Sequence, residues 1–466
     1  MPRVSSVVII GGGPGGYEAA LVARQLGADV TLVDRDGIGG SAVLTDCVPS
    51  KALIATANVI TTAASSADLG VLIGGRTPDP SLVGVDLKSV NERILGLVRA
   101  QSQDIAARLV HDGVRIVPGT GRLDADGNVL VDRADGTQDH LAADTVLMAT
   151  GARPRVLPDA QPDGERILTW EQVYDLTDVP ERLIVVGSGV TGAEFAGAYH
   201  ALGSRVVLIS SRTRVLPSED PDAAQTLEDV WARRGLEVIG SARAVSARRT
   251  VHGVEVSLST GQVVTGSHVL MAVGSLPNTD GLGLEAAGVE ANEAGFVRVD
   301  RVSRTTRRGI YAAGDCTGVN MLASVAAMQG RIAMWHALGD AVTPLEPSMV
   351  SSTVFTNPEI ATVGLTQQDL DSGEFRGDVV LVPLARNARA KMEEQHHGFV
   401  KLFCRRGSRI VAGAVIVGPH ASELIFPVTV ALEQRLTVDE IASTFTVYPS
   451  LSGTIAEAAR RLRVAE

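Results

Sequence analysis

The sequence has few cysteines, no long apolar run and no surplus of positive charge. The three cysteines, Cys47, Cys316 and Cys404, are too few and too scattered for a disulfide framework or a zinc site, so no metal and a reducing, cytoplasmic setting are expected. Lys and Arg number 42 against 53 Asp and Glu, and the net charge of −11 argues against nonspecific binding to nucleic acid or to anionic membranes. No uninterrupted apolar run reaches about 18 residues and the N-terminus lacks a signal-peptide pattern, so no stable membrane anchor is expected.

Glycine, by contrast, is abundant. It supplies 49 of 466 residues, about a tenth of the chain against the usual ~7%. The glycines show no Gly-X-Y period, which excludes a collagen-like chain, so they are expected at particular backbone turns. At roughly 150 residues per domain, the length predicts about three domains.

The first glycine cluster has the full context of a dinucleotide-binding motif. A β-branched run over 7–10 leads into the pattern G-x-G-x-x-G, a helix-like segment over 17–24 follows, and a second strand over 30–33 ends at Asp34. The three motif glycines allow, in order, a tight turn, a close approach of the pyrophosphate, and packing of the helix on the strand; the acid can hold a ribose hydroxyl. The residues expected at this first glycine turn are Gly11, Gly13, Pro14, Gly15, Gly16 and Asp34.

The same pattern recurs about 176 residues later, with Gly187, Gly189 and Gly192 at the turn. Its second strand, 206–209, leads into Ser210-Ser211-Arg212-Thr213-Arg214 instead of an acid. A carboxylate would repel a 2′-phosphate, whereas hydroxyls and an arginine accommodate one, so this second site should tolerate or prefer NADP(H). The alternative is that Arg212 and Arg214 are solvated surface charges.

Hydrophobic patterning elsewhere predicts alternating helices and strands. A long helix is expected over 87–112 and a strand over 145–148. The last stretch is expected to combine strands over 398–403 and 410–417 with helices over 421–434 and 438–443.

Further short motifs accompany the two glycine turns. They are Gly39-Gly40-Ser41, Cys47-Val48-Pro49-Ser50-Lys51, Ala149-Thr150-Gly151, Tyr311-Ala312-Ala313-Gly314-Asp315 and Phe355-Thr356-Asn357-Pro358-Glu359. With these motifs the chain resembles, over essentially its whole length, the flavoprotein disulfide reductase family, that of dihydrolipoamide dehydrogenase and glutathione reductase. The resemblance implies FAD at the first glycine turn, a nicotinamide nucleotide at the second, and a homodimer or higher homo-oligomer.

The fold implied by the resemblance is α/β. Two doubly wound, Rossmann-like dinucleotide-binding domains are expected, together with a C-terminal α+β dimerisation domain. The expected boundaries are 1–153 with 275–345 for a discontinuous FAD-binding domain, 154–274 for the NAD(P)H-binding domain, and 346–466 for the interface domain.

The resemblance also implies roles for individual residues. Asp34 would hold the adenosine ribose of FAD, and Asp315 the ribityl or pyrophosphate region. Lys51 would lie by the flavin ring, where a cation stabilises reduced flavin, and Glu194 would pair with it near the nicotinamide. The remaining expected cofactor contacts are Gly40, Ser41, Thr150, Gly151, Gly187, Gly189, Gly192, Arg212, Gly274, Gly314 and Ala323.

Three departures from the family pattern affect the residues that carry out dithiol–disulfide exchange in that family. Position 42, where the first cysteine of the redox pair would stand, is Ala42, and a redox disulfide needs both sulfurs. The catalytic histidine is replaced by Tyr448, whose ordinary pKa near 10 makes it a poor thiol base, and the orienting glutamate by Gly453. Dithiol–disulfide exchange is therefore not the expected chemistry.

The expected activity is electron transfer from NAD(P)H through FAD directly to a quinone-type acceptor, with Lys51, Glu194 and Tyr448 as the catalytic candidates. The resemblance here is to lipoamide-dehydrogenase-like NAD(P)H:quinone reductases. Two alternatives stay open: a soluble pyridine nucleotide transhydrogenase, from NADPH to NAD⁺, and a catalytically silent FAD-binding scaffold or sensor. Cys47 is interpreted as a remnant beside the flavin, with a one-thiol catalyst as its alternative. His396 and His397 are interpreted as a solvated loop.

Overall fold

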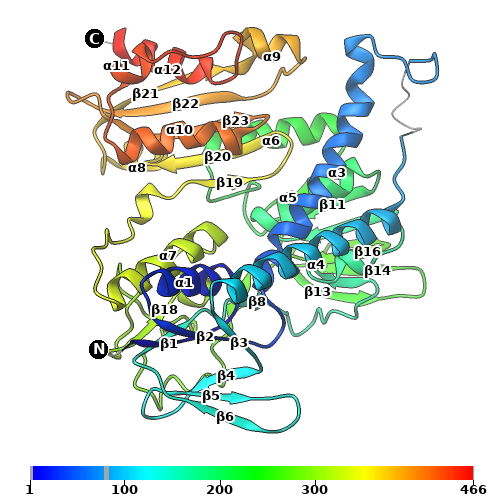
Figure 1. Ribbon diagram of the computed structural model, residues 1–466. Helices are drawn as coiled ribbons and strands as arrows, with labels where there is room; N and C mark the ends of the chain where they lie inside the picture. The colour runs from blue at the N-terminus through cyan, green and yellow to red at the C-terminus, as the bar shows by residue number, and fades with distance from the viewer. Residues whose placement is uncertain (1–3, 78–82, 465–466) are drawn as a thin grey trace. The chain divides into compact units, whose positions relative to one another are not determined.

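The computed structural model describes residues 4–77 and 83–464 and contains two compact units (Figure 1). Unit 1 comprises Met1–Ala52, Asn91–Arg155 and Gly274–Pro347, and unit 2 comprises Leu53–Val90, Val156–Val273 and Ser348–Glu466. Each unit is described by itself. The three-domain boundaries expected from the sequence remain a prediction.

Unit 1 is built on a five-stranded parallel sheet of order β18-β7-β1-β2-β3. Apolar residues of α1 and α7, which lie side by side in Figure 1, form one buried cluster with the sheet, and a second cluster lies under the small antiparallel sheet β4-β5-β6. Strands covered on both faces read as continuous apolar runs, which is why 7–10 is so uniformly β-branched. The bounds are β1 Ser6–Ile10, α1 Pro14–Gln25, β2 Asp29–Asp34, α2 Gly40–Leu44, β3 Arg115–Pro118, β4 Thr120–Leu123, β5 Val129–Asp132, β6 Gln138–Leu141, β7 Thr145–Met148, β8 Ala152–Pro154, β17 Ser275–Pro277, β18 Ile310–Ala312 and α7 Ala323–Ala337.

Unit 2 repeats this architecture in its first sheet, which is parallel with the order β12-β11-β10-β16-β9. An antiparallel sheet, β13-β14-β15, shares a buried cluster with it. The bounds are β9 Ile167–Thr169, β10 Arg182–Val186, α5 Val190–Ala201, β11 Arg205–Ile209, α6 Pro221–Arg234, β12 Glu237–Ile239, β13 Ala244–Arg249, β14 Val254–Leu258, β15 Val263–Gly266 and β16 His268–Met271.

The second sheet of unit 2 is antiparallel, of order β19-β20-β23-β22-β21. All eight residues of β23 are buried, because α10 and α12 contribute to the core cluster that this strand centres. The bounds are β19 Ser352–Val354, β20 Glu359–Gly364, α8 Gln367–Ser372, β21 Gly377–Pro383, α9 Ala388–Met392, β22 Phe399–Arg405, β23 Val411–Gly418, α10 Ala421–Glu433, α11 Val438–Ser443 and α12 Gly453–Val464. Two Rossmann-like sheets and a C-terminal α+β domain confirm the predicted fold class.

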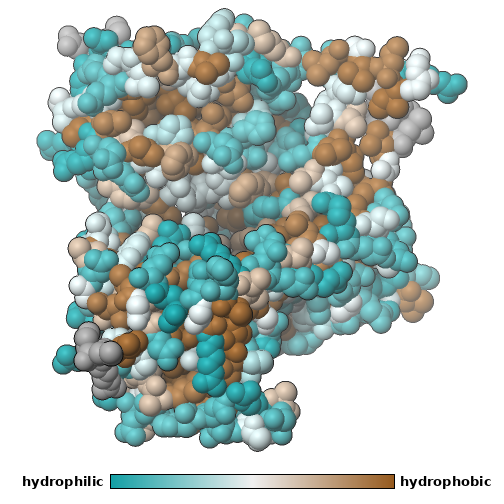
Figure 2. All heavy atoms as spheres, in the orientation of Figure 1, coloured by the Kyte–Doolittle hydropathy of each residue, from teal (hydrophilic) through white to brown (hydrophobic). Residues whose placement is uncertain are grey.

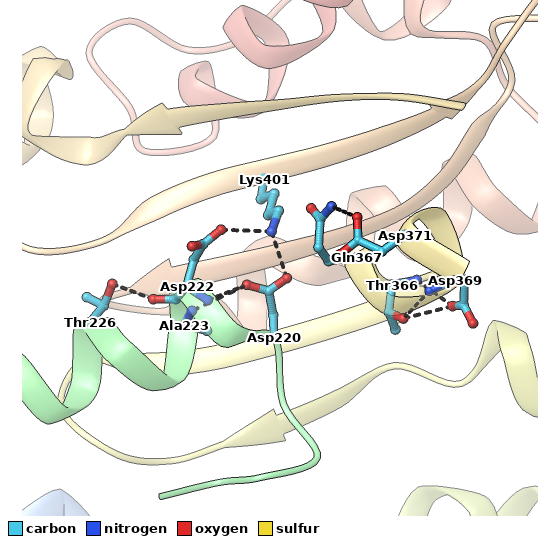
Figure 3. Close-up of polar contacts among 9 residues, drawn as sticks. All are labelled: Asp220, Asp222, Ala223, Thr226, Thr366, Gln367, Asp369, Asp371 and Lys401. Atoms are coloured by element: carbon cyan, nitrogen blue, oxygen red, sulfur yellow. Dashed lines mark hydrogen bonds and ion pairs between the residues drawn. The ribbon is translucent and has the colours of Figure 1, made fainter. Parts of the chain in front are cut away.

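An ion-pair cluster around the buried Lys401 joins the antiparallel sheet β19-β20-β23-β22-β21 to the start of α6 (Figure 3). The ammonium of Lys401, on β22, lies 2.9 Å from Asp220 Oδ2 and 2.8 Å from Asp222 Oδ2. Asp220 also caps α6, since its Oδ1 accepts hydrogen bonds from the backbone N–H groups of Asp222 and Ala223. The strand β22 and the start of α6 are therefore held together by charge.

Two long helices contain residues of both units: α3 Cys47–Ser65 and α4 Leu87–His111. The stretch Gly40–Leu69, which includes α3, is the one described helical segment long and apolar enough to cross a membrane, and a third of its most apolar window is buried. Threonine, serine and asparagine interrupt it, which is why no uninterrupted apolar run marks it in the sequence. A core helix of a soluble protein passes the same test. Leu69, Leu72 and Ile73, at the C-terminal end of this stretch and just after it, are exposed. Figure 2 shows exposed apolar atoms, in brown, at the upper right of the view.

Candidate functional site

The first glycine turn admits no side chain at two of its positions. Gly11 follows β1 with φ of +106°, and a Cβ there would lie 2.2 Å from the carbonyl oxygen of Ala149. A Cβ on Gly16 would lie 1.8 Å from the carbonyl oxygen of Gly11. Helix α1 then begins at Pro14, and no side chain caps it, so its first-turn N–H groups can bind a phosphate.

The second glycine turn, in unit 2, has nearly the same backbone. Gly187 has φ of +115°, and its Cβ would lie 2.0 Å from the carbonyl oxygen of Ala272; on Gly192 the Cβ would lie 1.9 Å from the carbonyl oxygen of Gly187. The N-cap residue Gly189 has φ −73° and ψ −174°, against −71° and −176° at Gly13. Helix α5 also starts without a side-chain cap, so both turns present the same phosphate-binding geometry.

In unit 1 the expected cofactor residues gather at one edge of the sheet. The four strands β1, β2, β7 and β18 run parallel, so the segments that follow their carboxyl ends lie along the same edge. These segments carry Gly11, Asp34, Thr150 and Gly314. Dinucleotides bind in this position on open parallel sheets.

Asp34 braces the loop after β2. Its Oδ2 accepts a hydrogen bond from the N–H of Gly12 at 2.6 Å, and its Oδ1 accepts from Asp36 at 2.9 Å and Gly37 at 2.6 Å. Burial raises the pKa of this carboxyl in spite of the three donors. Gly40 packs on the same turn, because a Cβ on it would lie 2.6 Å from Gly13 Cα, and Ser41 is its exposed neighbour in α2.

The segments after β7 and β18 are fixed by two amide side chains. Asn278 Nδ2 donates to the carbonyl oxygen of Thr150 at 3.0 Å, and the N–H of Gly314 donates to Oε1 of the buried Gln329 at 2.8 Å. Burial, and then the charge of Asp46, raises the pKa of Asp315 to about 6. Gly151 and Gly274 both have positive φ, and Ala323 is the first residue of α7.

A cavity of about 390 Å³ beside Asp34 shows residues that the sequence reasoning missed. Arg153 lines it and donates to the carbonyl oxygen of Pro277 at 3.0 Å, to Asn278 Oδ1 at 3.2 Å and to Asp280 Oδ2 at 2.6 Å. In the sequence, the only indication that Arg153 lies near this site is its position two residues after Gly151. Asn278 and Asp280 reach the cavity from a segment distant in sequence, and no local pattern marks them.

In unit 2, Ser210 takes the place that Asp34 has in unit 1. It is fully buried directly after β11, its hydroxyl lies 2.7 Å from the Ser188 hydroxyl, and it accepts from the N–H of Arg212 at 3.1 Å. Ser210 thus braces the turn and the following loop as Asp34 does, but carries no charge. Arg212 and Arg214 are exposed on that loop.

The three catalytic candidates belong to different parts of the chain: Lys51 to unit 1, and Glu194 and Tyr448 to unit 2. Glu194, on α5, is 3% exposed, and its Oε1 accepts a hydrogen bond from the N–H of Phe355 at 2.9 Å. Lys51, on α3, belongs to unit 1, so its pairing with Glu194 remains a prediction. Tyr448 lies in unit 2 with 85% of its surface exposed, beside a cavity of about 370 Å³ that Gly453 also lines.

None of the three cysteines forms a disulfide in the part of the chain that the structure describes, and Ala42 lies within α2. Cys316 and Cys404 are buried, and burial raises the pKa of the Cys316 thiol to about 11 and also raises that of Cys404. Thiols with raised pKa values are poor nucleophiles, which fits packing roles. In the described chain no group of three His, Cys, Asp or Glu residues could hold a metal, and His396 and His397 are exposed.

The two sites fit the cofactors that the sequence implies. Two phosphates need glycines that admit no Cβ and a helix start without a side-chain cap, and both turns have these features. A ribose needs a polar side chain at the end of the second strand, where Asp34 stands in one unit and Ser210 in the other. The residues that would hold FAD lie in unit 1, around Gly11, Asp34 and Asp315. Those that would hold the nicotinamide nucleotide lie in unit 2, around Gly187 and Arg212.

Known proteins share this architecture. Residues 5–330 match the family model for pyridine nucleotide-disulphide oxidoreductases, and residues 350–459 match the model for the dimerisation domain of the same proteins. The chain is 53% identical, over 98% of its length and 94% of the relative's, to a protein of Mycobacterium tuberculosis named NAD(P)H dehydrogenase (quinone). It is 34% identical, over 98% of its length and 97% of the relative's, to dihydrolipoyl dehydrogenase 2 of Haloarcula marismortui.

A solved structure of a relative has the same fold. The crystal structure of LpdA from Mycobacterium tuberculosis matches with a TM-score of 0.94 and 52% identity, covering 98% of this chain and all of that one. Members of the matching family use FAD and NAD(P)H. The chain belongs to the pyridine nucleotide-disulphide oxidoreductase family.

Proposed function

We propose that this chain is an FAD-dependent oxidoreductase that passes electrons from NAD(P)H through the flavin directly to a quinone. The observation that carries the proposal is Ala42, which stands where the resemblance places the first cysteine of the redox pair, while the glycine turns of both expected nucleotide sites are present. The Mycobacterium tuberculosis relative named NAD(P)H dehydrogenase (quinone) supports the acceptor class. Bound FAD would supply the two-electron relay between the nucleotide and the acceptor.

The chain's own residues would bind and orient the reactants. The N-termini of α1 and α5 would hold the pyrophosphates, and Lys51 would place a positive charge by the flavin ring. Glu194 is held by the Phe355 N–H and would border the nicotinamide. Arg212, exposed after the uncharged Ser210, would contact a 2′-phosphate, which favours NADPH.

The active species is proposed to be a homodimer in the cytoplasm. Phe426, Phe445, Val447 and Tyr448 are exposed on the domain that matches the dimerisation model, with Phe445 fully so. Apolar side chains grouped on a surface are typical of an interface. Three cysteines, none of them in a disulfide among the described residues, fit a reducing compartment.

Anaerobic half-reactions test the proposal. Holoprotein is mixed with NADPH or NADH, and flavin absorbance is followed; the reduced protein is then offered menadione, an NAD⁺ analogue or lipoamide. We expect bleaching by the nucleotide, rapid reoxidation by menadione and none by lipoamide. Faster reoxidation by the NAD⁺ analogue would instead indicate a transhydrogenase, and failure of either nucleotide to bleach the flavin would indicate a silent scaffold.

Cys47→Ser tests the role left to the remaining cysteine. Because Ala42 stands in place of the second thiol that a redox disulfide needs, we expect the variant to keep both flavin reduction and menadione turnover. Loss of menadione turnover with normal bleaching would show that Cys47 takes part in the second half-reaction.

A further inference from the structure

A second cavity, of about 500 Å³, lies within unit 2 and has no part in the nucleotide site. Its walls come from one face of α3, from α5, from the end of α6, and from the segment after β19. This volume is in the range of pockets that bind small molecules. We name it the α3–α5 cavity.

The walls of the α3–α5 cavity are formed mostly by apolar side chains. Ile54, Ala57 and Thr61 recur along α3 at helical spacing, and the buried indole of Trp231 faces them from α6. Gly197 lies in the interior of α5 with room for a side chain: its Cβ would meet Trp231 only at 3.7 Å. A glycine inside a helix costs about 1 kcal/mol relative to alanine, so its effect here is to leave space in the cavity.

The polar end of the cavity is positive. Arg234 and His200 line it, and no aspartate or glutamate is among its lining residues. The Arg234 guanidinium donates to the backbone oxygen and Oδ1 of Asn357, at 3.2 and 3.4 Å, so its hydrogen-bond acceptors are neutral. Burial, and then the charge of Arg233, lowers the pKa of Arg234, because neither favours the charged form.

His200 adds an unsatisfied acceptor to the same end. Its Nε2 lies 3.0 Å from the carbonyl oxygen of Arg234 and therefore carries the proton in the neutral ring, while its buried Nδ1 has no hydrogen-bond partner among the described residues. A buried acceptor left in this way is typical of a site that a water completes, and a water that donates to Nδ1 can also donate to an anion beside Arg234.

We propose that the α3–α5 cavity binds a small carboxylic acid with an apolar body, its carboxylate on Arg234 and its body against Trp231. The site is next to Glu194, which is not among its lining residues. Phe355 lines the cavity and also anchors Glu194 through its N–H, and Gly197 follows Glu194 by one turn of α5. A bound acid therefore contacts the backbone that positions Glu194.

Calorimetric titration of the FAD-loaded protein tests the site without measuring turnover. The probes are 2-naphthoate and its uncharged isostere 2-naphthamide. We expect saturable binding of 2-naphthoate, with one site per chain, and binding of the amide weaker by about tenfold or more, since charge-assisted hydrogen bonds are lost. Equal affinity for the two probes, or no saturable binding of the acid, would overturn the proposal.

Three variants locate the binding. Arg234→Met should weaken 2-naphthoate by about tenfold and leave 2-naphthamide unchanged, and Gly197→Val should weaken both by filling the cavity. Arg233→Met is the matched control, because Arg233 is the adjacent arginine, is exposed as Arg234 is, and does not line the cavity. Flavin content and far-ultraviolet circular dichroism check that each variant folds. If Arg233→Met lowered the affinity as much as Arg234→Met, the cavity would not be the binding site.

Discussion

Removing the charge of Lys401 should destabilise unit 2 strongly. The Lys401 side chain is 4% exposed and that of Asp220 1%, and the ammonium lies within 2.9 Å of Asp220 and 2.8 Å of Asp222. In Lys401→Met the carboxylate of Asp220 would stay buried without a counter-charge. Breaking one side of such a buried pair costs about 3–5 kcal/mol, so the free energy of unfolding should fall by that amount.

A double-mutant cycle separates the ion pair from simple loss of packing. Asp220→Asn keeps a good N-cap for α6 while removing the buried charge, so Lys401→Met with Asp220→Asn should be more stable than Lys401→Met alone. Urea unfolding followed by tryptophan fluorescence measures each protein, because Trp231 is buried on α6. Lys391→Met, at an exposed lysine, is the control. A loss below about 1 kcal/mol in Lys401→Met, or a double variant less stable than Lys401→Met, would refute the reasoning.

Three further predictions concern the cofactor sites. Arg212→Gln should raise the KM for NADPH about tenfold and leave the KM for NADH unchanged, because one charge-assisted contact to the 2′-phosphate is lost; equal changes in steady-state assays would contradict this. Gly192→Ala should impair nucleotide binding while the protein keeps its flavin spectrum, whereas Gly16→Ala should lose FAD, since each added Cβ would lie under 2 Å from a carbonyl oxygen. The pKa of Asp315 is raised from 3.8 to about 6, so between these pH values the folded apoprotein holds a proton that the unfolded chain has lost. The contribution of this proton to the free energy of unfolding is fully present below pH 3.8 and is lost as the pH rises through about 6. Asp46→Asn should flatten that slope in urea unfolding of the apoprotein, and an unchanged slope would count against the interaction of Asp46 with Asp315.

The parts of the fold that depend on local sequence were predictable. The strand expected over 145–148 is β7, Thr145–Met148, and the helix expected over 438–443 is α11, Val438–Ser443. The helix expected over 87–112 is α4, which ends one residue earlier at His111. Continuous apolar runs and glycine turns mark buried parallel strands and tight connections directly, because backbone conformation there depends on neighbouring residues.

The parts that depend on long-range contacts were not predictable. Nothing near Lys401 in the sequence shows that two aspartates about 180 residues earlier neutralise it. In the same way, the effect of Asp46 on Asp315 and the placement of Arg153 by Asn278 exist only after the sheet brings distant strand ends together. The α3–α5 cavity is likewise formed by five segments that are separate in sequence.

The near identity of the two glycine turns has an evolutionary consequence. No residue with a side chain can replace Gly11, Gly16, Gly187 or Gly192 without a shift of the backbone, because backbone oxygens occupy the space that a Cβ would need. The residue at the end of the second strand is not restricted in that way, since it is Asp34 in one unit and Ser210 in the other, and each accepts a hydrogen bond from a backbone N–H of the following loop. A substitution at this single position can therefore change the charge beside the expected ribose site without disturbing the backbone of the glycine turn.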